Sequence, residues 1–144
     1  MLIIIKLFLA LITLTSIVSS CFASENIAIR IGDNVYSAIL ENNVTATEIF
    51  KHLPLTLELN RYAEHEYYSE LPFKPEFARE RTSHIKAGHL YYWDGWNAFV
   101  INYEDYDISP YKVVHIGTVN DASEIAEYLR GAGEKVNVTV QKGE

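Results

Sequence analysis

Ten tyrosine and tryptophan side chains fall within a stretch of 50 residues, an uneven loading for a chain that is 12% aromatic. Aromatic rings with polar tips suit ligand or peptide surfaces, because they offer contact area at a low entropic cost. The competing interpretation is that they fill a β-structure, since strands are enriched in Tyr and Trp and alternate members face inward. The ten residues are Tyr62, Tyr67, Tyr68, Tyr91, Tyr92, Trp93, Trp96, Tyr103, Tyr106 and Tyr111.

Two tryptophans stand out from this set. Trp93 and Trp96 flank an Asp-Gly turn, where side chains are expected to reach solvent, so they are the strongest candidates for ligand contacts. Further aromatic residues and one amide are grouped with them as the lining of a cleft for a small molecule or an extended peptide. The candidate ligand-binding residues are Tyr62, Tyr92, Trp93, Trp96, Asn97 and Tyr103.

Three histidines, His65, His84 and His89, lie in or beside a glutamate-rich segment. Imidazole and carboxylate are ligands for zinc and other divalent ions, but these spacings match no metal motif, so a solvated charged loop is the stronger interpretation. The acidic turn at residues 104–107 offers oxygens of the kind that Ca²⁺ prefers, yet it lacks the glycine-centred spacing of an EF-hand. We therefore predict neither a metal nor a cofactor.

The sequence carries no signature of nucleophilic catalysis. It has no Gly-x-Ser-x-Gly elbow, and its single cysteine, Cys21, excludes both an internal disulfide framework and a zinc cluster built from thiolates. The net charge of −7 repels a phosphate backbone, so nucleic acid is not an expected partner.

Residues 1–23 have the pattern of an export signal. Lys6 is the only charge before an apolar stretch of about a dozen residues, which is short of the ~20 that span a bilayer; an uncleaved anchor is the alternative. Cleavage is predicted before Ser24, or at Cys21, where Val18–Cys21 resembles a lipobox. We expect an exported protein, periplasmic or extracellular, that contacts a membrane only through its signal or through a lipid anchor on Cys21.

Residues 24–144 are predicted to form one mainly β domain. Thr45 opens a Ser/Thr-x-x-Glu capping box, so a short helix is expected from there to Pro54, and a second one is expected between Asp121 and Gly131. Segment 61–87 is irregular and charged, and we expect it to be a long excursion. Extended runs and period-two alternation predict strands at 26–31, 35–40, 55–59, 89–93, 98–103, 112–117 and 136–140.

The order of these elements decides the fold class. Strands do not alternate regularly with long helices, as a parallel sheet would require, and a closed sheet leaves no edge strand to aggregate. We therefore predict a closed antiparallel barrel of about eight strands, with the two short helices capping it.

Four strings of residues carry a family resemblance: Asn42–Ala46, Leu53–Leu57, Leu71-Pro72 and, above all, Gly88–Phe99. In this order they resemble the bacterial cyclophilin-like fold proteins, and the likeness covers nearly all of residues 26–141. It implies an eight-stranded barrel related in shape to cyclophilin, in a family without a settled biochemical role. The Phe-His-Arg and Gln-Phe-Phe strings of true cyclophilins are missing, so the resemblance carries over no catalytic residue.

The leading hypothesis is an exported cyclophilin-like domain that binds a small molecule or extended peptide through an aromatic cleft and performs no chemistry. The alternative is a peptidyl-prolyl isomerase acting on exported proteins, with Arg61, Arg79 or Arg81 as the cation that weakens amide resonance. A purely structural role in an envelope assembly is a third hypothesis.

Overall fold

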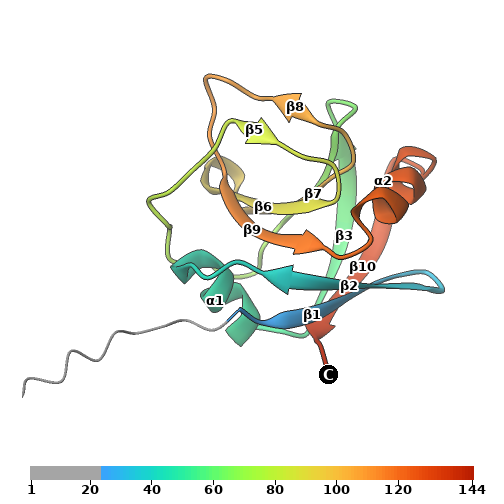
Figure 1. The fold of residues 1–144 in the computed structure, drawn as a ribbon, viewed down its shortest axis with the longest axis horizontal. Helices are drawn as coiled ribbons and strands as arrows, with labels where there is room; N and C mark the ends of the chain where they lie inside the picture. Colours follow the sequence, from blue (N-terminus) through green and yellow to red (C-terminus); the bar gives the residue numbers. More distant parts are fainter. Residues whose placement is uncertain (1–23) are drawn as a thin grey trace, which may run out of the picture.

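The computed structural model describes residues 24–144, and eight of their strands close into an antiparallel barrel (Figure 1). Around the barrel the order is β1, β10, β3, β4, β7, β6, β9, β2. The prediction of a mainly β, closed, eight-stranded barrel with two helices is confirmed. The predicted signal peptide, including Cys21, lies outside the described residues.

The elements follow one another along the chain with short connections, apart from one long irregular stretch between β4 and β5. They are β1 (Asn26–Ile31), β2 (Asn34–Leu40), α1 (Val44–Lys51), β3 (Leu55–Tyr62), β4 (Glu66–Glu70), β5 (His84–Ile85), β6 (His89–Trp93), the 3₁₀ turn η1 (Asp94–Trp96), β7 (Ala98–Asn102), β8 (Tyr106–Asp107), β9 (Val114–Val119), α2 (Ala122–Arg130) and β10 (Lys135–Lys142). No helix among these residues combines the length and the apolar character needed to cross a membrane.

Strand β10 closes the barrel, because it pairs with β1 on one side and with β3 on the other. Val140 lies opposite both Ile29 and Leu55, and Val138 lies opposite both Ile31 and Leu57. These residues are all buried, since alternate positions of each strand face the interior. The alternation that predicted the strands therefore builds the main core.

Helix α1 is capped two residues earlier than its sequence suggested. The N-cap is Asn43, whose Oδ1 accepts a hydrogen bond from the Ala46 amide at 2.9 Å, so the prediction of Thr45 as the cap is wrong. Thr45 is instead buried. Its hydroxyl donates to the Glu76 carbonyl at 2.7 Å and accepts from the Ala78 amide at 2.9 Å, which ties the irregular segment onto the helix.

The segment 61–87, expected to be the least regular part of the domain, contains a barrel strand. Strand β4 lies between β3 and β7, with Tyr68 opposite Asn60 on one side and Val100 on the other. The turn that leads into it holds Ala63 and Glu64 at φ angles of 52° and 58°. Such left-handed turns usually carry Gly or Asn, so Ala63 and Glu64 are no turn signal before this strand.

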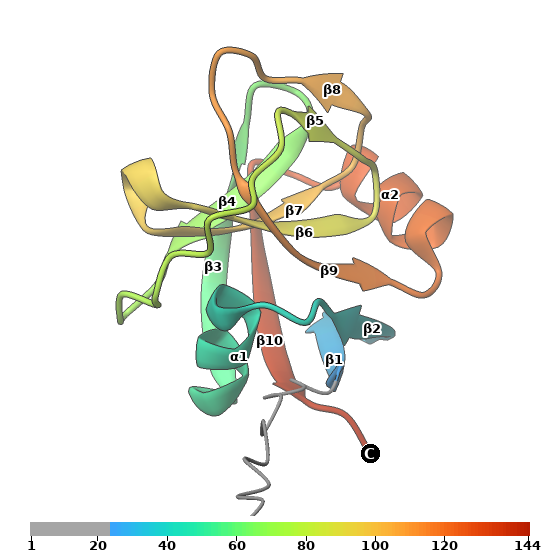
Figure 2. The ribbon, with the colours of Figure 1, turned by 60° about the vertical axis from the view of Figure 1, so that its left-hand side comes forward.

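Strands β5 and β8 form a separate two-stranded sheet that lies outside the barrel, above β6 and β7 in Figures 1 and 2. We call residues 81–87 and 104–113, which contain these strands, the outer arm. A second core cluster fills the space between the arm and the barrel; its buried members are Ile85, Tyr91, Ala98, Val100 and Val113. Because both of its faces are covered, β7 is buried along its whole length.

Candidate ligand-binding site

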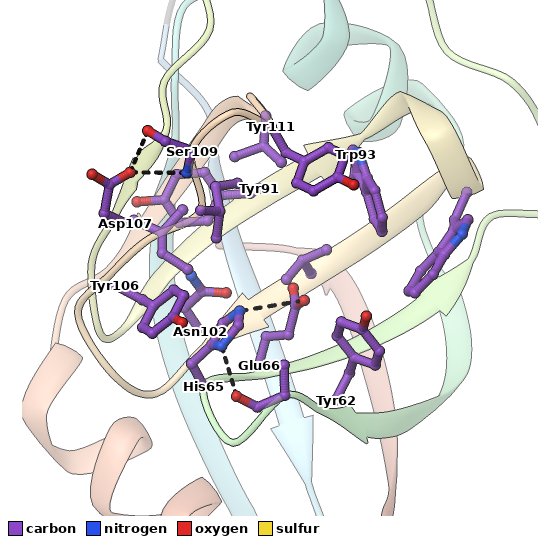
Figure 3. A pocket seen from close by; sticks show the side chains of 16 residues that line it. Tyr62, His65, Glu66, Tyr91, Trp93, Asn102, Tyr106, Asp107, Ser109 and Tyr111 are labelled. Atoms are coloured by element: carbon purple, nitrogen blue, oxygen red, sulfur yellow. Dashed lines mark hydrogen bonds and ion pairs between the residues drawn. The ribbon is translucent and has the colours of Figure 1, made fainter.

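A pocket of about 550 Å³ opens between the outer arm and the outer face of the barrel (Figure 3). Strands β4, β6 and β7 supply its floor, the arm supplies the opposite wall, and Tyr62 and η1 lie at one end. The lining residues are Tyr62, Ala63, His65, Glu66, Ile85, Tyr91, Trp93, Trp96, Val100, Asn102, Tyr106, Asp107, Ile108, Ser109, Tyr111 and Val113. The volume falls within the ~300–1,000 Å³ of small-molecule sites.

Asn102, the last residue of β7, is the most unusual group in this lining. Its side chain is fully buried, yet neither Nδ2 nor Oδ1 has a hydrogen-bond partner. Its backbone carbonyl is engaged, because it accepts from the Gly88 amide at 2.9 Å. Leaving a buried polar group unpaired costs about 1–3 kcal/mol, so nearly all such groups in folded proteins have partners. An amide that can both donate and accept therefore faces this pocket without a partner.

Aromatic side chains form the wall at the other end of the pocket. The Trp93 and Trp96 ring centroids lie 4.3 Å apart, and Trp96 meets Tyr62 edge to face at 5.1 Å. Tyr111 of the arm approaches Trp93 at 6.2 Å. Tyr62, Trp96, Tyr106 and Tyr111 are all exposed, so much of the exposed aromatic surface in residues 24–144 gathers at this one pocket. Contiguous apolar surface of this kind marks binding sites.

His65 and Glu66 form the charged part of the lining. The His65 Nδ1 donates to the Ala63 carbonyl at 2.8 Å, while its Nε2 lies 3.5 Å from Oε1 of Glu66. Its ring stacks on Tyr106 with the centroids 4.6 Å apart. The hydrogen bond to Glu66 raises the pKa of His65, although burial opposes the shift.

The structure brings three of the six predicted site residues together. Tyr62, Trp93 and Trp96 line the pocket, whereas Tyr92, Asn97 and Tyr103 do not.

Those three residues have structural contacts instead. Tyr92 faces the barrel interior, because strand alternation turns it away from Trp93, and its hydroxyl donates to Asn97 Oδ1 at 2.8 Å. Asn97 in turn donates to the carbonyls of Leu71 and Phe73. Tyr103 is buried in the main core, and its hydroxyl accepts from the Arg61 guanidinium at 3.0 Å.

The histidines considered as metal ligands lie at separate places. His65 faces the pocket, His84 lies 3.9 Å from Asp107 on the arm, and His89 pairs with His115. The acidic turn is also engaged, since Asp105 accepts from the Ala87 amide. Within residues 24–144, no group of three or more His, Cys, Asp or Glu side chains is placed to hold a metal ion.

His89 and His115 border a smaller pocket of about 380 Å³. His89 Nδ1 lies 3.0 Å from His115 Nε2, and the Thr118 hydroxyl lies within 3.4 Å of both nitrogens. His115 Nδ1 faces Glu41 at 3.3 Å. Burial lowers the pKa of both histidines, and repulsion between them lowers that of His89 further; nearby Lys86 acts in the same direction.

Acidification is expected to destabilise the fold through this histidine pair. Because both pKa values are lowered in the folded state, the unfolded chain binds more protons, so stability falls as the pH falls through about 6.5. His65 acts oppositely, since its raised pKa gives stability at acid pH that is lost as the pH rises. Urea denaturation at pH 7.5, 6.5 and 5.5 should show a smaller acid loss in the double variant His89→Gln, His115→Gln than in the native protein.

The control for this experiment is His84→Gln, which changes an exposed histidine on the arm. Its pH profile gives the baseline for the loss of one histidine, against which the double variant is compared. Parallel pH profiles for the native protein and the double variant would contradict the expected role of the pair.

Comparison with known proteins gives the same picture of the fold. The sequence matches the model of a family described as the cyclophilin-like family over residues 29–141. A search of curated proteins finds no match.

Two solved structures illustrate the likeness. The solution structure of the hypothetical protein AF2241 from Archaeoglobus fulgidus has a TM-score of 0.66 and 19% identity, over 87% of this chain and 99% of that one. The structure of McbB in complex with tryptophan has a TM-score of 0.62 and 16% identity, over 82% of this chain and 45% of McbB. Identities this low show the fold alone.

Proposed function

The chain belongs to the cyclophilin-like family, and from this premise we propose that it binds a small organic molecule in the pocket between the barrel and the outer arm. The volume of that pocket suits such a ligand, and its lining combines apolar walls with a few polar groups, which is typical of small-molecule sites.

One observation carries the proposal: the side chain of Asn102 is buried and unpartnered at the pocket floor. A ligand with a carbonyl and a hydroxyl or N–H group would satisfy both ends of the amide, while the aromatic wall would hold its apolar body. The cost of the unpaired amide would then be recovered on binding, which favours a ligand that makes these hydrogen bonds over one that does not.

The isomerase alternative finds no support at this pocket. No arginine of the described residues lines it. Arg61 is bonded to the carboxyl end of α2, and Arg81 lies over the Phe77 ring, 4.8 Å from its centroid. A coupled assay with a proline peptide, run at several protein concentrations, measures the rate of cis/trans isomerisation. We expect this rate to equal that of the uncatalysed reaction, which takes tens of seconds.

The decisive variant is Asn102→Leu. It removes the unpaired amide at nearly constant volume, so it should raise the free energy of unfolding by about 1–3 kcal/mol while it weakens ligand binding. The measurement is a thermal-shift screen of a fragment library against the native protein. Each hit is then titrated against Asn102→Leu, where we expect at least a tenfold loss of affinity.

The matched control is Asn137→Leu, which changes an exposed asparagine on β10. It should change neither binding nor stability appreciably. A destabilised Asn102→Leu protein that keeps full affinity for the hits would remove the basis of the proposal, as would a screen that yields no hit.

We also propose that binding takes place outside the cytoplasm, with the predicted signal in residues 1–23 as the support. Mass spectrometry of the native N-terminus is the test. A free Ser24 would indicate a released protein, an acylated Cys21 an envelope-anchored one, and an intact Met1 on soluble cytoplasmic protein would contradict export.

A further inference from the structure

The aromatic wall of the pocket stands beside negative charge, and we infer that the ligand carries a methylated ammonium group. This inference rests on the proposed function and specifies the chemical class of the ligand. Quaternary and methylated ammonium groups are bound in proteins by several aromatic faces that surround the cation.

The rings meet at steep angles, as adjacent walls of a box do. The planes of Tyr62 and Trp96 are 79° apart, those of Trp93 and Trp96 are 53° apart, and those of Trp93 and Tyr111 are 67° apart. All four residues line the same pocket, so their rings border one space from different directions. A flat ligand can stack on only one or two such faces, whereas a roughly spherical cation is attracted to every face that it touches.

The charges of the lining favour a cation. Glu66 and Asp107 line the pocket, and no Lys or Arg among the described residues does. Among the residues of 24–144 that line the pocket, His65 alone can become positive, so their formal charge is −2 when it is neutral and −1 when it is protonated. The Glu66 side chain is only 13% exposed, which limits solvent screening of its charge. An anionic ligand would be repelled in either state.

Hydrogen-bonding capacity distinguishes a methylated ammonium from a primary amine. A primary ammonium group has three N–H donors to satisfy, and aromatic faces have no lone pairs that could replace its water shell. A quaternary ammonium has no such donors, so it loses its water at a lower free-energy cost when it enters the aromatic wall of the pocket. The remainder of the ligand, bearing a hydroxyl or carbonyl group, would extend toward Asn102.

Intrinsic fluorescence reports on this site directly, because the two tryptophans of the sequence are Trp93 and Trp96. The protein is titrated with choline and, separately, with 3,3-dimethylbutan-1-ol, which has the same shape without the charge. We expect choline to change the fluorescence with a Kd of about 1 mM or below, and to bind at least fivefold more tightly than the neutral compound.

Variants locate the binding. Trp96→Ala should lower the affinity for choline about fivefold or more. Tyr62→Leu should have a similar effect, and it tests the aromatic wall if the first variant folds poorly. Glu66→Gln should lower the affinity for choline and leave the affinity for the neutral compound unchanged. The control is Tyr128→Ala, which removes an aromatic ring of similar exposure on α2, away from the pocket; choline affinity should stay at the native value.

The two proposals can fail separately. Equal affinity for choline and its neutral counterpart, or no fluorescence change with choline, overturns the ammonium inference. If fragment hits bind the native protein and lose affinity in Asn102→Leu, the proposed function stands even when the ammonium inference fails. If choline binds as expected but Asn102→Leu leaves every ligand unaffected, the ammonium inference stands and the role proposed for Asn102 falls.

Discussion

Replacing Gly88 with alanine is expected to destabilise the fold by about 3–5 kcal/mol, because two costs add at this position. Gly88 has a φ angle of 77°, which residues with a side chain adopt only under strain. A Cβ atom built there would lie 2.4 Å from Cβ of Ala122 and 2.5 Å from its Cα, at the first residue of α2. The helix backbone would therefore have to move. Urea denaturation of the native and Gly88→Ala proteins measures the difference.

The same substitution should also disturb the ligand site, since the Gly88 amide donates to the Asn102 carbonyl. Gly133→Ala is the matched control, because a Cβ atom at that glycine would meet nothing within 4 Å. Its stability should remain within about 0.5 kcal/mol of the native value. Similar unfolding midpoints for the two alanine variants would refute the close approach of Gly88 to α2.

Replacing Arg61 with methionine is expected to cost about 2–3 kcal/mol, since hydrogen bonds from a charged donor are among the stronger ones. From β3, its Nη2 donates to the carbonyls of Leu129, Arg130 and Ala132 at 2.9, 3.3 and 2.6 Å. These lie at the carboxyl end of α2, where the helix dipole also favours a cation. Methionine keeps the apolar contacts but leaves the carbonyls without this donor. Chemical denaturation followed by circular dichroism gives the change in free energy.

Arg30→Met provides the comparison for this experiment. Arg30 is an exposed arginine on β1, so its replacement tests the loss of one surface charge alone. We expect a change below about 0.5 kcal/mol. If the two methionine variants lose equal stability, Arg61 does not anchor the helix in the way its contacts indicate.

Most of the barrel could be predicted because its strands alternate, and burial on one face is a local property of the sequence. Val136–Val140 and Leu55–Leu59 show this clearly, and both became barrel strands. Strand β4 was missed, since it has only five residues, glutamate at both ends and two adjacent tyrosines that blur the period. The cap of α1 was misplaced because Asn43 and Thr45 are both good cap residues, and tertiary contacts of Thr45 decided between them.

The ligand site was predictable only in part. Trp93 and Trp96 are close in sequence and flank one turn, so their proximity followed from local structure. Tyr92 was predicted to line the same site as Trp93, but adjacent residues of a strand face opposite sides, so Tyr92 faces the barrel interior. Asn102 was missed, yet it shares a strand face with Ala98 and Val100, and a polar residue in such a row is a signal. That its amide lacks a partner depends on the outer arm, whose docking no local pattern indicates.

The place of β10 between β1 and β3 affects how the chain can fold while it is being made. A ribosome delivers β1 early and β10 last of the eight strands, so a nascent chain without β10 cannot close the barrel and leaves the borders of β1 and β3 unpaired. Closure of the barrel must therefore wait for the final strand to emerge. If residues 1–23 direct the chain to a translocation channel, this delay would keep the barrel open, so that the chain could still pass through the channel until most of it has been synthesised.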